Sequence, residues 1–213
     1  RCCRRQRQMC IRDRFNSNWT LNKFIKGLNK KYNTNKLEVI NQSTSKKIIN
    51  FKNKKKIILF VGRLNASKGY DLFGKAIISV LNNNPYWKAI VIGDEPRENH
   101  IFEHKNLKIL GFQKYNVVTK WFVKSDISVI CSRWDEPFGR TALEASSAGC
   151  AVIITDKGGL SEASPKAMKI KSLKVKNIEN SIEKLIKNVS LKKSLQKRIC
   201  LLYTSDAADD NTC

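Results

Sequence analysis

The chain has 213 residues, enough for one compact domain and part of another, and 41% of them are hydrophobic, which supports a sizeable core. No apolar run reaches the roughly 18 residues of a membrane-spanning helix, so no membrane span is expected. The formal net charge of +23 raises the question of a polyanionic partner, which depends on how the lysines are distributed.

The two ends of the chain are unlike the rest. Residues 1–14 and 200–213 resemble a transposon-type sequencing adapter, translated from one strand at the first end and from the opposite strand at the second. We expect both ends to be foreign and leave them out of the fold prediction. They contain five of the seven cysteines. The other two, Cys131 and Cys150, lie in apolar runs, which predicts buried free thiols and a reducing, cytoplasmic compartment.

Between these ends, the apolar pattern predicts alternating strands and helices. A helix beginning near Asn18, a short strand at 37–40 and a polar linker at 41–50 come first. Further strands are expected at 56–61, 89–93, 107–110, 127–131, 151–154 and, more weakly, 167–170. Further helices are expected at 70–81, 117–123 and 141–148, and over the amphipathic run from Ile178 to Val189.

Short, nearly continuous apolar strands separated by helices are typical of a parallel sheet that is covered on both faces. We therefore predict a doubly wound, Rossmann-like α/β domain over residues 51–199. Residues 15–50 are expected to form a separate N-terminal segment and linker. Ligands of such sheets bind beyond the carboxyl ends of the strands, which is where the candidate residues lie.

The loop after the strand at 56–61 carries two cations. Arg63 offers a planar fork for phosphate oxygens and Lys68 offers a point charge, while Gly62 and Gly69 allow close turns. The N-terminus of the following helix adds partial positive charge. Together these groups can hold a diphosphate without a metal ion. Two surface cations in an ordinary loop are the alternative, because charged loop residues are common.

Two glutamates eight positions apart lie where the strand at 127–131 is followed by a helix. Glu136 falls in the loop, and Glu144 falls in the second turn of the helix. The backbone amides of Phe138 and Gly139 lie near the helix start, where anions are favoured. Carboxylates accept strong hydrogen bonds from sugar hydroxyls, so one glutamate can bind a ribose diol and the other a hexose. The apolar neighbours of Glu144 favour this function over a solvated carboxylate.

Other positions carry weaker signals. The paired glycines at 158–159 permit close backbone approach to a ligand, although a plain tight turn explains them equally well. The loops that start at Asp94 and Gly111 can line a nucleobase pocket. His100 and His104 have no evident third ligand, so we expect no metal site.

The order and spacing of these residues are similar to those of a known family. The matching positions are Gly62-Arg63, Lys68-Gly69, Gly93-Asp94, Gly111-Phe112, Ser125-Asp126, Glu136-Pro137-Phe138-Gly139, Leu143-Glu144-Ala145, Gly149 and Gly158-Gly159 with Glu162. The pattern resembles the C-terminal, donor-binding domain of retaining GT-B glycosyltransferases, the glycosyl transferases group 1, which include lipopolysaccharide and glycan mannosyl- and glucosyltransferases. The resemblance covers about residues 56–190 and implies that residues 15–40 are a remnant of the N-terminal, acceptor-binding domain.

The resemblance implies transfer of a hexose from a nucleotide-diphosphate sugar to a glycan, lipid or other acceptor. The implied catalytic residues are Arg63, Lys68 and Glu136, and the implied donor-binding residues are Gly62, Phe138, Gly139 and Glu144. The two cations would contact the diphosphate, the first glutamate the donor sugar and the second the ribose. The backbone amides at 138 and 139 would help to hold sugar or phosphate. Such enzymes usually need no metal and no other cofactor. A fragment that lacks the acceptor domain is expected to be inactive alone.

Two alternatives stay open. A sugar-nucleotide epimerase shares the architecture, although the Glu136/Glu144 pair argues against it. A basic nucleic-acid-binding protein would account for the charge, which is still +21 without the two ends (35 basic minus 14 acidic residues). However, the lysines are scattered, and the run at 52–56 is expected to be a solvated linker end. We therefore expect no nucleic-acid partner, and peripheral contact with the anionic inner face of a membrane stays open. The acceptor and the oligomeric state are not predicted.

Overall fold

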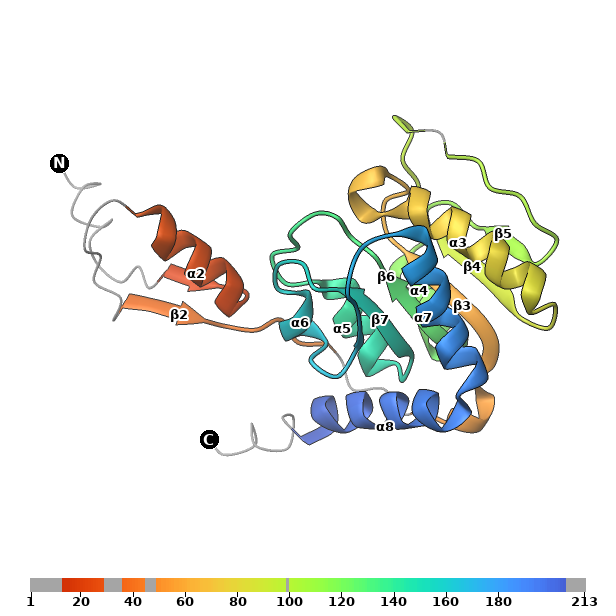
Figure 1. Cartoon of the computed structure of the whole chain (residues 1–213). Helices are drawn as coiled ribbons and strands as arrows, with labels where there is room; N and C mark the ends of the chain where they lie inside the picture. Colours follow the sequence, from red (N-terminus) through yellow and green to blue (C-terminus); the bar gives the residue numbers. More distant parts are fainter. Residues whose placement is uncertain (1–12, 29–35, 45–48, 99, 206–213) are drawn as a thin grey trace.

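The computed structural model describes residues 13–28, 36–44, 49–98 and 100–205 (Figure 1). Six parallel strands form the main sheet in the order β5-β4-β3-β6-β7-β8. Their bounds are β3 Lys55–Val61, β4 Lys88–Ile92, β5 Leu107–Ile109, β6 Ser125–Ile130, β7 Ala151–Thr155 and β8 Met168–Ile170. The predicted doubly wound, Rossmann-like sheet is therefore confirmed.

Helices cover both faces of this sheet. They are α3 Tyr70–Asn83, α4 Tyr115–Lys124, α5 Arg140–Ser147, α6 Leu160–Ala163, α7 Val175–Lys187 and α8 Val189–Ser205, with short 3-10 turns η2 Phe51–Asn53 and η3 Ala66–Lys68. Two successive residues of β3 show the layering. Ile58 packs in the core on the α3 and α7 side, and Ile57 packs in the core on the α4 and α5 side. The apolar runs are continuous because both faces of each central strand are buried.

The order of the strands places one reversal at the centre of the sheet. The chain runs outward from β3 through β4 to β5, returns to β6 beside β3, and then runs outward again to β8. The loops after β3 and β6 therefore leave the sheet in opposite directions and open a crevice between them. These are the loops that carry the predicted Arg63, Lys68 and Glu136.

A smaller unit precedes the sheet. It consists of β1 Asp13–Phe15, α2 Asn18–Gly27 and β2 Leu37–Val39, with β1 and β2 paired in parallel. The cap of α2 is Ser17, whose hydroxyl accepts the Thr20 backbone N–H, and the expected start at Asn18 is the first helical residue. The strand β1 and the helix α8 cross the boundaries expected at 14 and 200, and the foreign origin of the two ends stays a prediction.

Two further sequence expectations concern the cysteines and the lysine-rich run at 52–56. Cys131 and Cys150 are buried free thiols, as predicted, and burial raises the pKa of Cys131 to about 12. The expectation that residues 52–56 are a solvated linker end is wrong for Lys54. Its ammonium donates to the carbonyl oxygens of Phe122 (3.0 Å) and Ala148 (2.7 Å), among others, so it ties the linker to the ends of α4 and α5.

Within the described ranges, no helix is long and apolar enough to cross a membrane.

Candidate functional site

The loops after β3 and β6 meet at the crevice. The ammonium of Lys68, at the end of η3, lies 2.5 Å from a carboxylate oxygen of Glu136. Both side chains are partly buried, at 31% and 13% exposure. With Gly62 and Gly139 they line a hollow of about 230 Å³. Four of the seven predicted site residues thus surround one small cavity.

A backbone contact fastens the two loops to each other. The carbonyl oxygen of Ser67 accepts the backbone N–H of Arg133 (2.8 Å) and of Trp134 (3.2 Å), and also the hydroxyl of Ser132 (3.1 Å). The Arg133 guanidinium then reaches past this contact to both carboxylate oxygens of Asp71 on α3, at 2.6 and 2.7 Å. The Arg133 hydrogen bond lowers the pKa of Asp71, and the same bond raises the pKa of Arg133. We call the ion pair of Arg133 and Asp71 the clamp. Together with the Ser67 contacts, it sets the position of Glu136 relative to Lys68.

The paired glycines hold the other side of the Glu136 loop. Gly158 has φ +61°, and a Cβ there would lie 2.1 Å from the carbonyl oxygen of Glu136. The backbone N–H of Gly159 donates to that same oxygen at 2.6 Å. Gly158 and Glu136 form a parallel bridge that joins the loops after β6 and β7. The close approach that the sequence predicted here is made to another backbone segment of the chain.

Arg63 lines a second hollow beside the first. This hollow has a volume of about 290 Å³ and shares Gly62 with the first one. Asp94 and Phe112 also line it, so the loops expected to form a nucleobase pocket lie together next to Arg63. The phenyl ring of Phe112 is 76% exposed and offers a flat apolar surface at the rim.

The remaining predicted residues lie at the start of α5. Phe138 is buried in the core on the α4 and α5 side, and Gly139 caps the helix with φ +100°. Across the described ranges, the backbone N–H groups of these two residues donate no hydrogen bond, so both remain available at the N-terminus of α5. Glu144 is buried at 9% exposure, and its carboxylate accepts from Arg140 at 2.9 Å. Glu144 lines neither of the two hollows, and its predicted role stays a prediction.

The two histidines have different polar neighbours. His100 lies 3.0 Å from Glu98, and His104 lies 3.2 Å from the side chain of Asn82. Over residues 13–28, 36–44, 49–98 and 100–205, no group of three or more His, Cys, Asp or Glu side chains could hold a metal ion.

Sequence reasoning gave no positioning role to four residues whose contacts lie around the site. Arg133 and Asp71 are 62 positions apart, and no local pattern joins them. Glu162 accepts the backbone N–H groups of Asn18 and Trp19, both at 2.7 Å, and so holds the N-terminus of α2 against the domain. The hydroxyl of Ser17 donates to the carbonyl oxygen of Pro137, so the smaller unit touches the loop that leads into α5.

Comparisons with known proteins agree with this geometry. A family model described as "Glycosyl transferases group 1" matches residues 41–199. The chain is 35% identical over 121 residues to spore coat protein SA of Bacillus subtilis, a match that covers 49% of this chain and 31% of that protein. It is 32% identical over 131 residues to the lipopolysaccharide core biosynthesis mannosyltransferase LpsB of Rhizobium meliloti, covering 57% and 37% respectively. The chain thus matches about a third of the length of these curated relatives.

The fold also matches solved structures. The chain is similar to Anabaena Alr3699/HepE, solved in complex with UDP-glucose, with a TM-score of 0.73 at 17% identity. The match covers 90% of this chain and 58% of that one, and at this identity it supports the fold alone. Because the family model covers most of the chain, and because the sheet and its crevice have the expected form, the chain belongs to the glycosyl transferases group 1 family, as a C-terminal domain of the GT-B fold.

Proposed function

We propose that the protein to which this chain belongs is a retaining glycosyltransferase that transfers a hexose from a nucleotide-diphosphate sugar to a glycan, lipid or other acceptor. The observation that carries this proposal is the pairing of Lys68 and Glu136 across the hollow between β3 and β6. A cation and a carboxylate at this distance can receive the two unlike halves of a sugar diphosphate, one anionic and one rich in hydroxyls.

The cations are proposed to bind the diphosphate. Lys68 lines the first hollow and Arg63 the second, and Gly62, which has no side chain, lines both. A diphosphate that bridges the two hollows would contact both cations. They would also stabilise the negative charge that develops on the leaving diphosphate, and we propose that this is why the reaction needs no metal ion.

Carboxylates and backbone amides are proposed to hold the sugar and ribose. Glu136, which is mostly buried, would accept hydrogen bonds from the hexose close to the reacting carbon. The backbone N–H groups of Phe138 and Gly139 would donate to sugar or phosphate oxygens at the start of α5. Glu144 would bind the ribose after exchanging its contact with Arg140, whose side chain is 70% exposed and free to move.

The nucleobase is proposed to occupy the second hollow. Its lining combines the polar groups of Asp94 and Gln113 with the exposed ring of Phe112. A flat apolar ring and a few convergent polar groups suit a heterocyclic base. We also propose a reducing, cytoplasmic place of action, because the two buried cysteines are free thiols.

We propose that the chain by itself binds the nucleotide but transfers no sugar, because it matches only about a third of the length of its relatives. Titration calorimetry with UDP and with GDP tests the site. Arg63→Ala and Glu144→Ala should each weaken saturable binding by about tenfold, since each removes a charge-assisted hydrogen bond. Lys75→Ala, at an exposed position on α3, is the control and should bind like the parent chain. Binding that is unchanged in both site variants would refute the assignment.

A further inference from the structure

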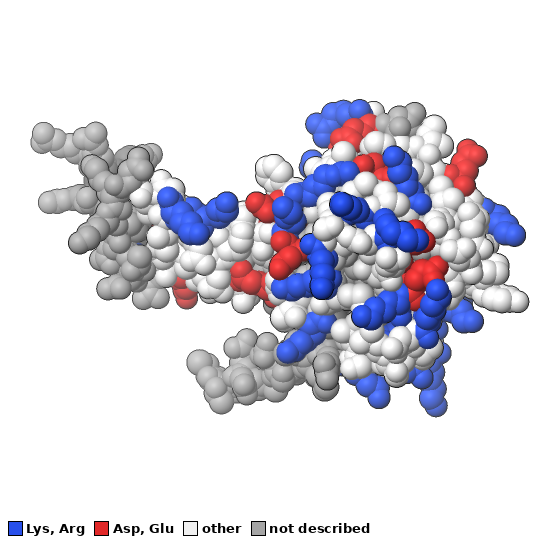
Figure 2. Space-filling view, in the orientation of Figure 1, with Lys and Arg blue, Asp and Glu red and all other residues white. Residues whose placement is uncertain are grey.

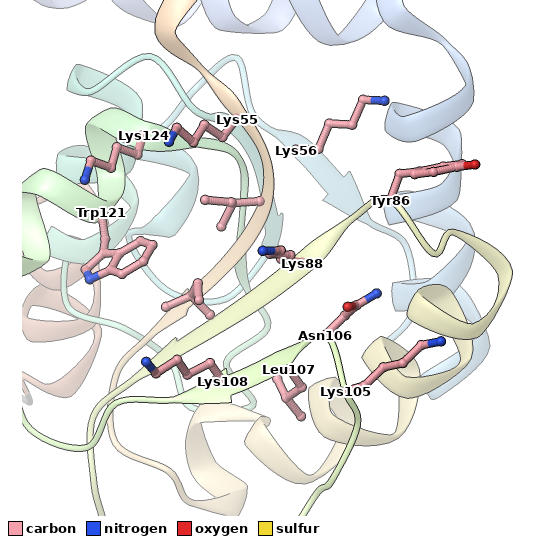
Figure 3. Close-up of a pocket in the computed structure, with 12 residues that line it drawn as sticks. Lys55, Lys56, Tyr86, Lys88, Lys105, Asn106, Leu107, Lys108, Trp121 and Lys124 are labelled. Carbon is pink, nitrogen blue, oxygen red and sulfur yellow. The ribbon is translucent and has the colours of Figure 1, made fainter.

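A third hollow, larger than the two of the donor site, lies at the opposite end of the strands (Figure 3). It has a volume of about 560 Å³ and lies at the amino ends of β3, β4 and β5, beside the end of α4. Six lysines line it: Lys55, Lys56, Lys88, Lys105, Lys108 and Lys124. We call it the lysine hollow. Because β3 has seven residues, it lies on the order of 20 Å from the donor crevice.

The parallel sheet explains why these lysines gather. Amino ends of parallel strands meet at one edge, and the register pairs Ile57 with Lys88 and Ile90 with Lys108. Lysines far apart in the chain therefore meet at the amino edge of the sheet, where the consecutive Lys55 and Lys56 lie on opposite faces of β3 (Figure 3).

The lysine hollow carries uncompensated charge. Its lining contains six Lys and no Asp or Glu, which gives a formal charge of +6. All six side chains are exposed, and none forms an ion pair with any residue that the structure describes. On the face of the molecule that Figure 2 shows, blue and red side chains lie among one another. Concentrated positive charge of this kind attracts anionic partners.

Apolar and aromatic groups accompany these lysines. The lining includes Ile57, Ile90 and Leu107, together with the rings of Tyr86 and Trp121. Tyr86 is 83% exposed, unusually high for so large a side chain. Rings with an apolar body and a polar tip, placed beside lysines with long apolar stems, are typical of proteins at a membrane surface.

A single-stranded nucleic acid is the alternative anionic partner. The ammonium of Lys56 lies 5.8 Å from the centre of the Tyr86 ring, and that of Lys124 lies 5.8 Å from the centre of the Trp121 ring. Each ring therefore has a cation over one face and leaves the other face open to a base, so DNA binding must be measured beside vesicle binding. A second copy of the chain would bring the same charges together and be repelled.

We propose that the lysine hollow docks this domain on an anionic lipid bilayer, with the ammonium groups on the headgroup phosphates and Tyr86 at the interface. Such a bilayer presents a layer of phosphate groups next to apolar chains, which matches the ammonium groups and the apolar side chains of the lining. Docking through this edge leaves the carboxyl ends of β3 and β6 directed away from the membrane. The inference is therefore independent of the proposed transfer reaction.

Co-sedimentation of the full chain with vesicles tests this inference. Vesicles of phosphatidylcholine alone are compared with vesicles that also contain phosphatidylglycerol. One variant carries Lys88→Gln, Lys108→Gln and Lys124→Gln. The matched control carries Lys75→Gln, Lys184→Gln and Lys193→Gln, which removes the same charge from exposed helix positions outside the lysine hollow. Circular dichroism melts confirm that both variants fold.

The parent chain and the control should bind the anionic vesicles, whereas the first variant should bind them at least about tenfold more weakly. Phosphatidylcholine alone should bind none of them. Equal losses in both variants would show a response to net charge and overturn the inference.

Fluorescence anisotropy with a labelled single-stranded DNA adds a second measurement. If the first variant lost only DNA affinity, the occupant would be a nucleic acid and the bilayer proposal would be wrong. Lys68→Ala should bind vesicles like the parent chain, because Lys68 belongs to the donor site.

Discussion

The ammonium of Lys68 and the carboxylate of Glu136 lie 2.5 Å apart although the two residues are separated by 68 positions in the chain. Each partly neutralises the other in a site that is only partly open to water. An anion that binds Lys68 therefore competes with Glu136 for the same ammonium group. Removing the charge of Lys68 and removing the charge of Glu136 should therefore have different effects on the affinity for an anion.

Lys68→Met should weaken the binding of UDP or GDP, whichever the chain accepts, by about tenfold or more, because a charge-assisted hydrogen bond to the diphosphate is lost. Glu136→Gln should bind the same sugar-free nucleotide as tightly as the parent chain or more tightly, because the competing carboxylate is gone. Titration calorimetry measures both affinities. Equal losses in the two variants would contradict the proposed division between diphosphate and sugar.

The clamp between Arg133 and Asp71 should contribute to stability. A double-mutant cycle with Arg133→Ala and Asp71→Ala should give a coupling free energy of about 1 kcal/mol, because the pair is bidentate and partly buried at 37% and 21% exposure. Urea unfolding measures the four free energies of unfolding. The control pair is Lys169 and Asp156, separated by 3.3 Å at 45% and 61% exposure. That pair should show coupling near zero, and equal coupling in the two cycles would contradict the prediction.

Acid should weaken this clamp. The hydrogen bond from Arg133 holds the pKa of Asp71 below its ordinary value of 3.8 in the folded chain. A lowered pKa means that the stabilising contribution is complete above pH 3.8 and is lost as the pH falls through the lower, folded-state pKa.

The free energy of unfolding should therefore fall less steeply with acid in Asp71→Asn than in the parent chain. Urea denaturation at a series of pH values below about 5 measures the two slopes. Lys75→Ala, at an exposed position on α3, should keep the slope of the parent chain. Parallel slopes in Asp71→Asn and the parent chain would mean that Asp71 ionises alike in the folded and unfolded states.

Gly158→Ala should be more destabilising than Gly111→Ala. The two glycines have similar φ values of +61° and +65°, so both substitutions incur the same left-handed backbone cost of about 1 kcal/mol. Only at Gly158 would the new Cβ also meet a backbone oxygen, that of Glu136 at 2.1 Å, whereas nothing lies within 4 Å at Gly111.

We expect a loss of about 3 kcal/mol or more for Gly158→Ala and about 1 kcal/mol for Gly111→Ala. Thermal or urea unfolding measures the difference, which isolates the steric term. Because the bridge to Gly158 holds the Glu136 loop, Gly158→Ala should also weaken nucleotide binding. Similar losses of stability at both positions would show that the loop moves aside at little cost.

The sequence predicted the main elements well. The strand expected at 151–154 is observed as β7 Ala151–Thr155, and the helix expected at 70–81 is observed as α3 Tyr70–Asn83. These predictions succeed because burial imposes a period of about 3.6 on a helix and a continuous apolar run on a strand buried on both faces. The helix α6 was not predicted, since four residues are too short to show a period.

The sequence by itself determined the class of fold, the edge of the sheet where the candidate residues lie and the residue types that Arg63, Lys68 and Glu136 bring there, since these depend on local periodicity and on the residues directly after each strand. Only the tertiary structure decided that Lys68 contacts Glu136, that Arg133 reaches Asp71 and that Lys54 is held by backbone carbonyls. It also gathered lysines that look scattered in the sequence into the lysine hollow. Such contacts depend on strand order and register, which bring together residues that no local pattern relates.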